Sequence, residues 1–342
     1  MIRAVLVGCG AMSRAWLEAA RQIDGLTIVG LVDIDPDRAR QRAADFGLTE
    51  SAQTGSDLDL ILEGTRPDVV FDAVVPAARS SVALAAIGHG CHILSEKPLA
   101  ASLDEARAII AAARDKGRVA AVVQNRRYLA NVRRIRRLID SGVIGRPTSI
   151  HCDFFLAPHF GGFREEMDHV LLLDMAIHTF DAARAMTGLE AQRVYCHEWD
   201  PSNSWYRQGA SAVAIFEMSE GAVLTYRGSW CADGLRTSWE AAWRIVGERG
   251  SLTWDGFDNI NAEVVADAAR DGLFDASAPV DIPPSDGADR TGGHLGVMQD
   301  FIAAVRGGPA PETAAADNFR SLAMVFAAIR SAETRQPVDV ET

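Results

Sequence analysis

Apolar runs alternate with amphipathic stretches through the first third of the chain. The amphipathic stretches include Asp37–Phe46 and Leu103–Lys116, which predict helices. The apolar runs predict strands at Ile2–Val7, Thr27–Val32, Val69–Val74, His92–Leu94 and Val119–Val123. Strands that alternate with helices form a parallel sheet that is covered on both faces. Residues 1–124 are therefore predicted to form a doubly wound α/β domain.

The helix predicted from Leu103 has recognisable ends. Ser102 precedes it and Glu105 follows three residues later, which is the spacing of a capping box. Gly117 comes directly after the last predicted helical residue, Lys116, and glycine commonly terminates helices. The pattern thus fixes both the start and the end of this helix.

The pattern changes after Gln124, where we place the domain boundary. Helices are predicted at Asn131–Ser141, about Asp168–Thr187, Leu295–Arg306 and Ala314–Thr334. Strands separated by turn residues are predicted at Ser149–Leu156, Gln192–Glu198, Ser211–Met218, Ala222–Trp230, Trp239–Val246 and Ser251–Trp254. Their close succession indicates a mainly antiparallel sheet. Residues 125–342 are therefore predicted to form a second α/β domain with a large open sheet, and residues 266–293 to form an irregular connection.

The turn after the first predicted strand is rich in glycine. Gly8 and Gly10 precede a helix that begins near Ser13. Glycine in such a turn lets backbone N–H groups and the positive end of the helix approach a pyrophosphate. Ser13 stands where a third glycine usually allows close packing, and serine is small enough to preserve that contact. We predict a dinucleotide site that includes Gly8, Gly10, Ala11 and Met12.

An acidic residue ends the second predicted strand. Asp33 lies 33 − 10 = 23 residues beyond Gly10, close to the ~20-residue spacing at which a carboxylate binds the adenosine ribose hydroxyls. Its charge would repel a 2′-phosphate, so NAD is the expected cofactor. Arg38, Arg40 and Arg42 follow closely; one of them could accept that phosphate from NADP, or all three could form a solvated helix face.

Composition narrows the class of ligand. The chain has 342 residues, of which 48% are hydrophobic and 23% charged, as expected for two domains of a soluble enzyme. A net charge of −12 argues against general affinity for nucleic acid or for anionic membranes. The five cysteines are widely spaced, so reduced thiols and a cytoplasmic protein are expected. No apolar stretch reaches the ~18 residues of a membrane span, and we expect a small-molecule ligand.

Two further motifs carry titratable groups. Ser95–Pro98 stands at the carboxyl end of a predicted parallel strand, where open α/β sheets bind ligands. Lys97 could stabilise an alkoxide there, or form a solvated pair with Glu96. Asp174 and His178 are four residues apart and so project from one face of a predicted helix. The histidine could take a hydroxyl proton, with a local helix hydrogen bond as the alternative.

Together these motifs resemble one family. The chain is similar over nearly its whole length to the glucose-fructose oxidoreductase, inositol dehydrogenase and rhizopine-catabolism protein (Gfo/Idh/MocA) family. The resemblance rests on Gly8–Gly10, Asp33, Ser95–Leu99, Gln124–Tyr128, Leu173–His178 and Ile329–Ser331. It implies an N-terminal Rossmann domain that binds NAD or NADP. It also implies a C-terminal α/β domain whose open sheet packs against another subunit, as in a homodimer or homotetramer.

The resemblance also implies roles for individual residues. Lys97 and His178 would be the acid/base pair, Asp174 a ligand of a substrate hydroxyl, and Glu96 a contact of the nicotinamide ribose. In relatives the peptide bond that corresponds to Lys97–Pro98 is often cis. Pro76 and Asn125 would lie beside the cofactor. From their position, Asn125 and Arg127 flank the domain junction and are candidates to face the substrate, with a structural ion pair as the alternative for Arg127.

Two segments depart from the family pattern. Val75–Ser80 replaces the usual Thr-Pro-Asn segment, of which Pro76 alone remains. Asp168-His169-Val170 replaces a Gly-Gly-Gly run before the site helix. Asp168 and His169 either adjust substrate choice or cap that helix, since aspartate is a favoured N-cap residue.

The loop Pro158–Arg164 combines aromatic rings with an arginine. His159 and Arg164 are our candidates for substrate contacts there, since stacking and arginine hydrogen bonds suit a hydroxylated ring or an acidic sugar. An ordinary surface loop is the alternative. His151, His197 and His294 are expected to be structural or solvated.

The expected activity is hydride transfer between a nicotinamide and a carbinol carbon of a sugar, cyclitol or sugar derivative. No metal is required, because Lys97 can supply the positive charge and no cluster has the spacing of metal ligands. One rival is an enzyme that holds NAD tightly and oxidises a sugar transiently for elimination or glycoside cleavage. The other is a sensor of sugars or nucleotides without catalysis.

Overall fold

The computed structural model describes residues 1–266 and 273–342 and divides them into two compact units. Unit 1 contains Met1–Tyr128 and Arg290–Phe319, and unit 2 contains Leu129–Asp289 and Arg320–Thr342. A single division at residue 124 did not anticipate the return of residues 290–319 to unit 1. Helix α9 (Ala315–Thr334) contributes residues to both units.

Unit 1 is built on a parallel sheet of six strands in the order β3-β2-β1-β4-β5-β6. The strands are β1 (Ile2–Val7), β2 (Leu26–Val32), β3 (Gln53–Gly55), β4 (Val69–Asp72), β5 (His92–Ser95) and β6 (Ala120–Val122). This order reverses direction between β1 and β4, and doubly wound sheets bind ligands at that switch point. Every residue of β4 is buried, because helices cover both faces of such a sheet. The predicted doubly wound parallel sheet is confirmed.

Five helices accompany these strands. They are α1 (Ser13–Ala20), α2 (Pro36–Asp45), α3 (Leu58–Thr65), α4 (Pro76–Gly88) and α5 (Leu103–Asp115). The predicted start of α5 is confirmed, since Ser102 Oγ accepts a hydrogen bond from the Glu105 N–H at 3.2 Å. Glu105 Oε2 in turn accepts from the Ala101 N–H at 3.1 Å, so the side chains satisfy two backbone donors at this end.

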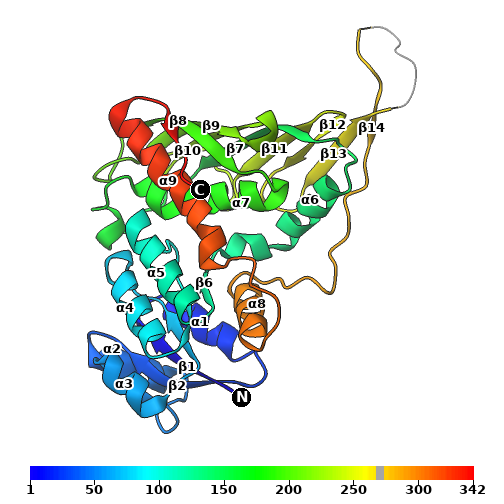
Figure 1. Ribbon diagram of the computed structural model, residues 1–342. Helices are drawn as coiled ribbons and strands as arrows, with labels where there is room; N and C mark the ends of the chain where they lie inside the picture. Colours follow the sequence, from blue (N-terminus) through cyan, green and yellow to red (C-terminus); the bar gives the residue numbers. More distant parts are fainter. Residues whose placement is uncertain (267–272) are drawn as a thin grey trace. The chain divides into compact units, whose positions relative to one another are not determined.

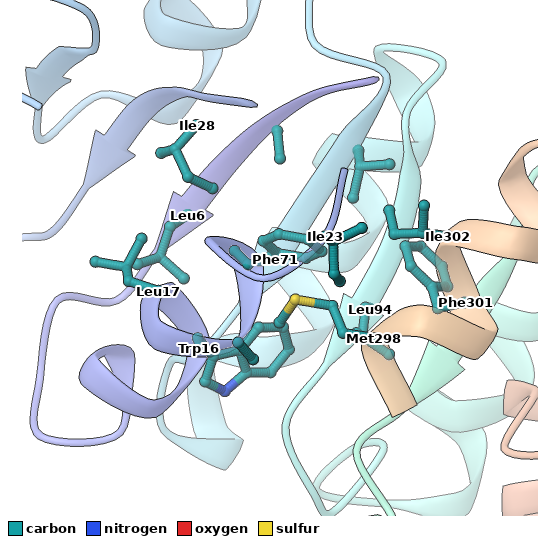
Figure 2. Close-up of a cluster of buried hydrophobic side chains, with 14 of the residues drawn as sticks. Leu6, Trp16, Leu17, Ile23, Ile28, Phe71, Leu94, Met298, Phe301 and Ile302 are labelled. Atoms are coloured by element: carbon teal, nitrogen blue, oxygen red, sulfur yellow. The ribbon is translucent and has the colours of Figure 1, made fainter. Parts of the chain in front are cut away.

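The returning segment completes the core of unit 1. Its helix α8 (His294–Val305) turns Met298, Phe301 and Ile302 toward Trp16 and Phe71, as Figure 2 shows. The short helix η1 (Asn125–Tyr128) is tied to the same segment, because Tyr128 Oη donates to Asp300 Oδ2 at 2.7 Å. Unit 1 therefore depends on residues from both ends of the chain.

Unit 2 contains a sheet of nine strands in the order β14-β13-β12-β11-β7-β10-β9-β8-β15. The strands are β7 (Pro147–Phe155), β8 (Ala191–Trp199), β9 (Ser211–Met218), β10 (Val223–Ser229), β11 (Ala242–Gly247), β12 (Gly250–Trp254), β13 (Ile260–Val265), β14 (Ser277–Pro279) and β15 (Val338–Asp339). Among the described strands of this sheet, β7 and β10 pair in parallel and the other neighbours are antiparallel. The predicted mainly antiparallel sheet is confirmed.

Helices cover one face of this sheet. They are α6 (Ala130–Asp140), the π-helical turn η3 (Leu171–Ala176) and α7 (Ile177–Thr187), which runs along the sheet in Figure 1. Phe180 of α7 packs edge-on against Phe216 and Tyr226. Residues that alternate with these along the strands point to the other face, where Tyr195 and Ile215 are 44% and 47% exposed.

Some element boundaries differ from the prediction. Strand β11 begins at Ala242 rather than at Trp239, which is 49% exposed. Strand β14 lies within residues 266–293, which were predicted to be irregular; a three-residue edge strand that ends in Pro279 has too little apolar pattern to be recognised. Residues 267–272 of that predicted connection lie outside the described residues. No helix in the described part of the chain is long and apolar enough to cross a membrane.

Candidate functional site

The glycine turn joins β1 to α1 at the centre of the unit 1 sheet. Gly8 has φ of +91°, and a Cβ there would lie 2.8 Å from the Ala73 carbonyl group, so only glycine fits. A Cβ on Gly10 would lie more than 4 Å from every atom of the described residues other than Gly10 itself and its two chain neighbours. The turn therefore leaves open space at Gly10, directly before the amino end of α1. Backbone N–H groups and the helix dipole favour an anion at such a place.

Ser13 and Asp33 hold this turn in shape. Ser13 is buried and its Oγ donates to the Gly10 carbonyl at 2.6 Å, so serine takes the place of the third glycine without loss of packing. Asp33 accepts from the Cys9 N–H at 2.7 Å and from the Asp35 N–H at 3.0 Å. Each carboxylate oxygen has a second lone pair, so Asp33 can still accept from ribose hydroxyls. These residues fit a bound dinucleotide.

The three arginines after Asp33 make contacts within the protein. Arg38 Nε lies 3.4 Å from the Asp35 carboxylate, and Arg40 pairs with Asp37. Arg42 Nη2 donates to the carbonyl groups of Gly10 at 3.2 Å and Cys9 at 3.3 Å. Arg42 therefore stabilises the glycine turn through its carbonyl groups. The pairs of Arg38 and Arg40 with aspartates agree with the alternative that these arginines form a charged helix face.

The remaining cofactor candidates lie in segments that follow β1, β4 and β6 of the unit 1 sheet. Ala11 and Met12 lie in the turn before α1, and Met12 is 43% exposed. Pro76 is the first residue of α4, the helix that follows β4. Asn125 begins η1 after β6, and its Oδ1 has no hydrogen-bond partner among the described residues. All of these residues follow carboxyl ends of strands in unit 1, and their contact with a cofactor stays a prediction.

Glu96 and Lys97 lie in the turn after β5, where the Lys97–Pro98 peptide bond is cis. Glu96 is buried, and its Oε1 accepts from Trp16 Nε1 at 2.8 Å and lies 3.3 Å from His294 Nε2. Burial alone would raise the pKa of Glu96, but the hydrogen bond and charge of His294, with the Trp16 N–H and Lys97, outweigh it and lower that pKa. The Glu96 carboxylate thus stays ionised and fixes the start of this turn.

His294 was expected to be structural or solvated, and its contact with Glu96 was not predicted. The two residues are 198 positions apart, and no local pattern links them. His294 also packs edge-on against Trp16, with the ring centroids 6.4 Å apart. The returning segment of unit 1 therefore supports the Glu96–Lys97 turn directly.

A buried ion pair also contacts this turn. Arg79 Nε lies 3.7 Å from Asp72 Oδ2, and both side chains are at most 1% exposed. The Arg79 guanidinium also donates to the carbonyl groups of Val74 and Pro98. Burial raises the pKa of Asp72 to about 6, although Arg79 and hydrogen bonds from Val74 and Ser95 oppose that rise. The pair therefore joins the end of β4 to the turn that carries Lys97.

In unit 2, Asp174 and His178 lie on one helix face. Between Leu171 and Phe180, only Leu173, Asp174 and His178 are not fully buried. Asp174 belongs to the π-helical turn η3 and His178 to the first turn of α7, so the expected single helix carries a local π-helical irregularity. Such irregularities often occur at functional sites. The two side chains that the sequence assigned to one face therefore do share it.

Asp174 is joined to a second predicted residue, Arg164. Arg164 Nε donates to Asp174 Oδ2 at 2.9 Å. His159, the other candidate of that loop, stacks on Trp205 with a centroid separation of 3.8 Å. In unit 1, Arg127 pairs with Asp317 at 2.7 Å and donates to the Glu312 carbonyl group, which matches the structural ion pair left open for it.

Asp168 and His169 contact other elements of unit 2. Asp168 pairs with Arg207 at 3.1 Å, and the residue that precedes η3 is Val170, which makes no side-chain cap. The helix-cap interpretation of Asp168 is therefore wrong. His169 has φ of +52°, and its Nδ1 lies 2.5 Å from Glu198 Oε2. Since Leu173 N–H donates to the His169 carbonyl at 3.0 Å, this ion pair fixes the start of the segment that carries Asp174.

The His169 pair predicts a pH dependence of stability. The hydrogen bond to Glu198 raises the pKa of His169; burial opposes this, and the charges of Glu198, Glu333 and Asp168 add to it. A histidine whose pKa is raised by folding stabilises the native state fully at pH values below its pKa in the unfolded chain, about 6.5. This stabilisation is lost as the pH rises through its pKa in the folded protein. We therefore expect the free energy of unfolding, measured with urea, to fall by about 1–2 kcal/mol as pH rises above neutral.

The matched variants are His169→Gln and His89→Gln. His169→Gln is expected to lack this fall. His89 pairs with Asp59 at an exposed position and serves as the control. The same pH slope in His169→Gln and in the unsubstituted protein would contradict the assignment.

The fold and the glycine turn define the class of protein. A doubly wound parallel sheet with a glycine turn at its switch point and an acidic residue after the second strand is a dinucleotide-binding domain. A family model described as an oxidoreductase family with an NAD-binding Rossmann fold matches residues 2–124. The model of the GFO/IDH/MocA C-terminal domain matches residues 132–253. The chain belongs to the GFO/IDH/MocA family of NAD-binding oxidoreductases.

Named relatives match along nearly the whole chain. The 1,5-anhydro-D-fructose reductase of Ensifer adhaerens is 25% identical over 98% of this chain and 98% of its own. The D-apiose dehydrogenase of Paraburkholderia graminis is 27% identical over 99% of this chain and 90% of its own. A crystal structure of an oxidoreductase from Agrobacterium radiobacter in complex with NAD+, L-tartaric acid and magnesium has a TM-score of 0.85, at 22% identity over 99% and 98% of the two chains. This last similarity shows a shared fold.

Proposed function

We propose that the protein transfers a hydride between NAD and a carbinol carbon of a sugar, cyclitol or sugar derivative. The observation that carries the proposal is the partly buried helix face with Asp174 and His178, in a chain whose other unit has the dinucleotide turn. Relatives named as a sugar dehydrogenase and an anhydrosugar reductase support this substrate class. In this proposal residues 125–342 supply the substrate-binding and oligomerisation functions.

Each side chain has one task in this proposal. Gly8, Gly10 and Asp33 would hold the dinucleotide, which supplies a nicotinamide ring that accepts or returns a hydride. His178 takes the proton of the substrate hydroxyl, and the Lys97 ammonium group stabilises the negative charge that develops on its oxygen. Asp174 accepts a hydrogen bond from a neighbouring hydroxyl. These groups carry the reaction without a metal ion.

The formation of NADH tests this function. Purified protein would be mixed with NAD or NADP and with aldoses, uronic acids, cyclitols and anhydrosugars, and the absorbance of the reduced cofactor would be followed. We expect reduction of NAD with at least one member of the panel. Consumption of substrate without accumulation of NADH would instead favour transient oxidation by a tightly held cofactor. Binding of NAD without any conversion of substrate would favour a sensor.

We also propose that the exposed sheet face of unit 2 binds a second copy of the chain. Tyr195 and Ile215 lie opposite each other on β8 and β9, and Tyr195, Ile215 and Trp199 are each 40–47% exposed. Clustered apolar side chains on a sheet face are typical of subunit interfaces. Sedimentation equilibrium is expected to give a dimer or tetramer mass, and a monomer at all concentrations would exclude this interface.

A further inference from the structure

Arg164 is held beside Asp174 in a fixed orientation. Its Nε donates to Asp174 Oδ2 at 2.9 Å, and the two side chains are 31% and 12% exposed. The guanidinium carbon lies 5.0 Å from the ring centre of Phe160 and 4.9 Å from that of Phe163. Contact with two aromatic rings favours one placement of the guanidinium plane.

The loop that carries Arg164 is itself anchored. Tyr206 Oη donates to the Pro158 carbonyl at 2.5 Å, and the Arg207 N–H donates to the Glu165 carbonyl at 2.8 Å. Within the loop, the Gly161 N–H donates to Glu165 Oε1 at 2.9 Å. The stack of His159 on Trp205 adds a further contact to the same segment. Arg164 thus projects from a segment whose shape is set before any ligand binds, which lowers the entropic cost of binding.

The hydrogen-bond donors of Arg164 are only partly used. A guanidinium has five N–H donors arranged along a side edge, which includes Nε, and an end edge formed by Nη1 and Nη2. Asp174 takes Nε on the side edge. Within residues 1–266 and 273–342, neither Nη of Arg164 has a hydrogen-bond partner. The end edge of a fixed, permanently charged fork is therefore available to a ligand.

We propose that the end edge of Arg164 binds a carboxylate of the substrate, so that the preferred substrates are sugar acids. Two parallel N–H donors match the two oxygens of a carboxylate, whereas a single hydroxyl oxygen uses only part of the fork. Asp174 neutralises the side edge, and Arg164 bridges one carboxylate of the protein and one of the substrate. The assignment rests on the proposed function, and it makes Arg164 a specificity-determining residue of the Asp174 face.

Matched pairs of substrates test the proposal. Each pair contains a sugar acid and its neutral counterpart: D-glucuronate with D-glucose, D-galacturonate with D-galactose, and D-gluconate with D-sorbitol. The kcat/KM for NAD reduction is measured for each member. We expect the protein to prefer the acid of at least one pair. Arg164→Gln is expected to lower kcat/KM for that acid by about 10- to 100-fold and to change the value for its neutral counterpart by less than about threefold.

Two further variants separate charge, geometry and folding. Arg164→Lys keeps the positive charge but removes the fork, so it is expected to recover only part of the preference. Arg146→Gln removes an arginine that also pairs with a carboxylate, Glu248, at an exposed position, and serves as the control. Structural damage from Arg164→Gln would lower the values for acid and neutral substrates alike, whereas loss of a carboxylate site lowers only the value for the acid.

The outcomes distinguish this inference from the proposed function. NADH formation with neutral substrates, without preference for any acid, overturns the inference and leaves the function intact. Absence of NADH formation with every substrate contradicts the proposed hydride transfer instead. The carboxylate site at Arg164 is then tested by the binding of sugar acids. In that case the shift of Tm by D-glucuronate, D-galacturonate and D-gluconate in the presence of NAD is compared between the unsubstituted protein and Arg164→Gln. A shift that Arg164→Gln removes supports the carboxylate site, and no shift, or equal shifts, overturns it.

Discussion

Replacement of His178 by glutamine is expected to lower kcat by about 10²- to 10⁴-fold, the usual contribution of a general base. Glutamine retains a polar side chain of similar length but cannot take the hydroxyl proton. Because no residue of the glycine turn changes, the affinity for NAD should stay within about twofold. Lys97→Met is expected to have an effect of similar size, since the oxygen of the substrate then loses its stabilising charge. Steady-state kinetics and titration with NAD measure both quantities.

The double variant tests whether the two residues act on one step. If His178 and Lys97 both serve the same substrate hydroxyl, the double variant should lose far less than the product of the two single losses. His151→Gln is the matched control, since His151 bonds Thr225 and Ser149 on the sheet of unit 2. A value of kcat in His178→Gln close to that of the control would remove His178 from the reaction. Multiplicative losses would mean that His178 and Lys97 contribute independently of each other.

Asp72→Asn is expected to destabilise the protein by about 1–3 kcal/mol at neutral pH. The change leaves the buried Arg79 guanidinium without its carboxylate partner at 3.7 Å. Two facts reduce the loss: Glu96 also interacts favourably with the charge of Arg79, and burial already disfavours the charge of Asp72. Burial lowers the pKa of Arg79, yet an arginine does not deprotonate near neutral pH. Urea unfolding followed by circular dichroism measures the change. A loss below about 1 kcal/mol would mean that water or a local rearrangement relieves the charge.

The reciprocal variant, Arg79→Met, has a different pH dependence. Folding raises the pKa of Asp72 to about 6, because burial disfavours the carboxylate more than Arg79 and the hydrogen bonds stabilise it, so folding favours the protonated carboxyl group over the ionised one. That contribution is complete below the unfolded value of about 3.9 and is lost as pH rises through the folded value. Without Arg79, which lowers the pKa of Asp72, the loss extends to higher pH. Arg79→Met is therefore expected to lose less stability at pH 5 than at pH 8.

The double variant Asp72→Asn/Arg79→Met is expected to lose less stability than the sum of the single variants, because neither charge remains buried alone. Arg79 also donates to the Pro98 carbonyl, next to Lys97. Additive losses would show that the two side chains contribute independently of each other.

Several site residues are paired in ways that their sequence context does not show. Arg164 and Asp174 were both assigned to the substrate from local patterns, and the structure shows that they bond each other. Asp168 is of a residue type that often caps helices and precedes the site helix, yet its side chain pairs with Arg207. In each case the partner lies on another segment, and the choice of partner depends on how the loops close rather than on spacing along the chain.

The sequence alone determined the features that depend on local order. Alternation of apolar runs and helical patterns, the glycine turn at Gly8 and the cap at Ser102 each involve residues within one or two elements. Periodicity, capping and backbone freedom at glycine act over a few residues, so they can be recognised without a structure. The doubly wound sheet, the antiparallel second sheet and the shared face of Asp174 and His178 followed from these signals.

Only the tertiary structure decided the pairings between distant segments. The return of residues 290–319 to unit 1, which brings His294 to Glu96, joins positions with no common periodicity. The buried pair of Asp72 and Arg79, the pairing of His169 with Glu198 and the open edge of Arg164 likewise depend on burial and on which polar groups remain to be satisfied once the chain has folded. Those requirements are properties of the packed interior and are absent from any single stretch of sequence.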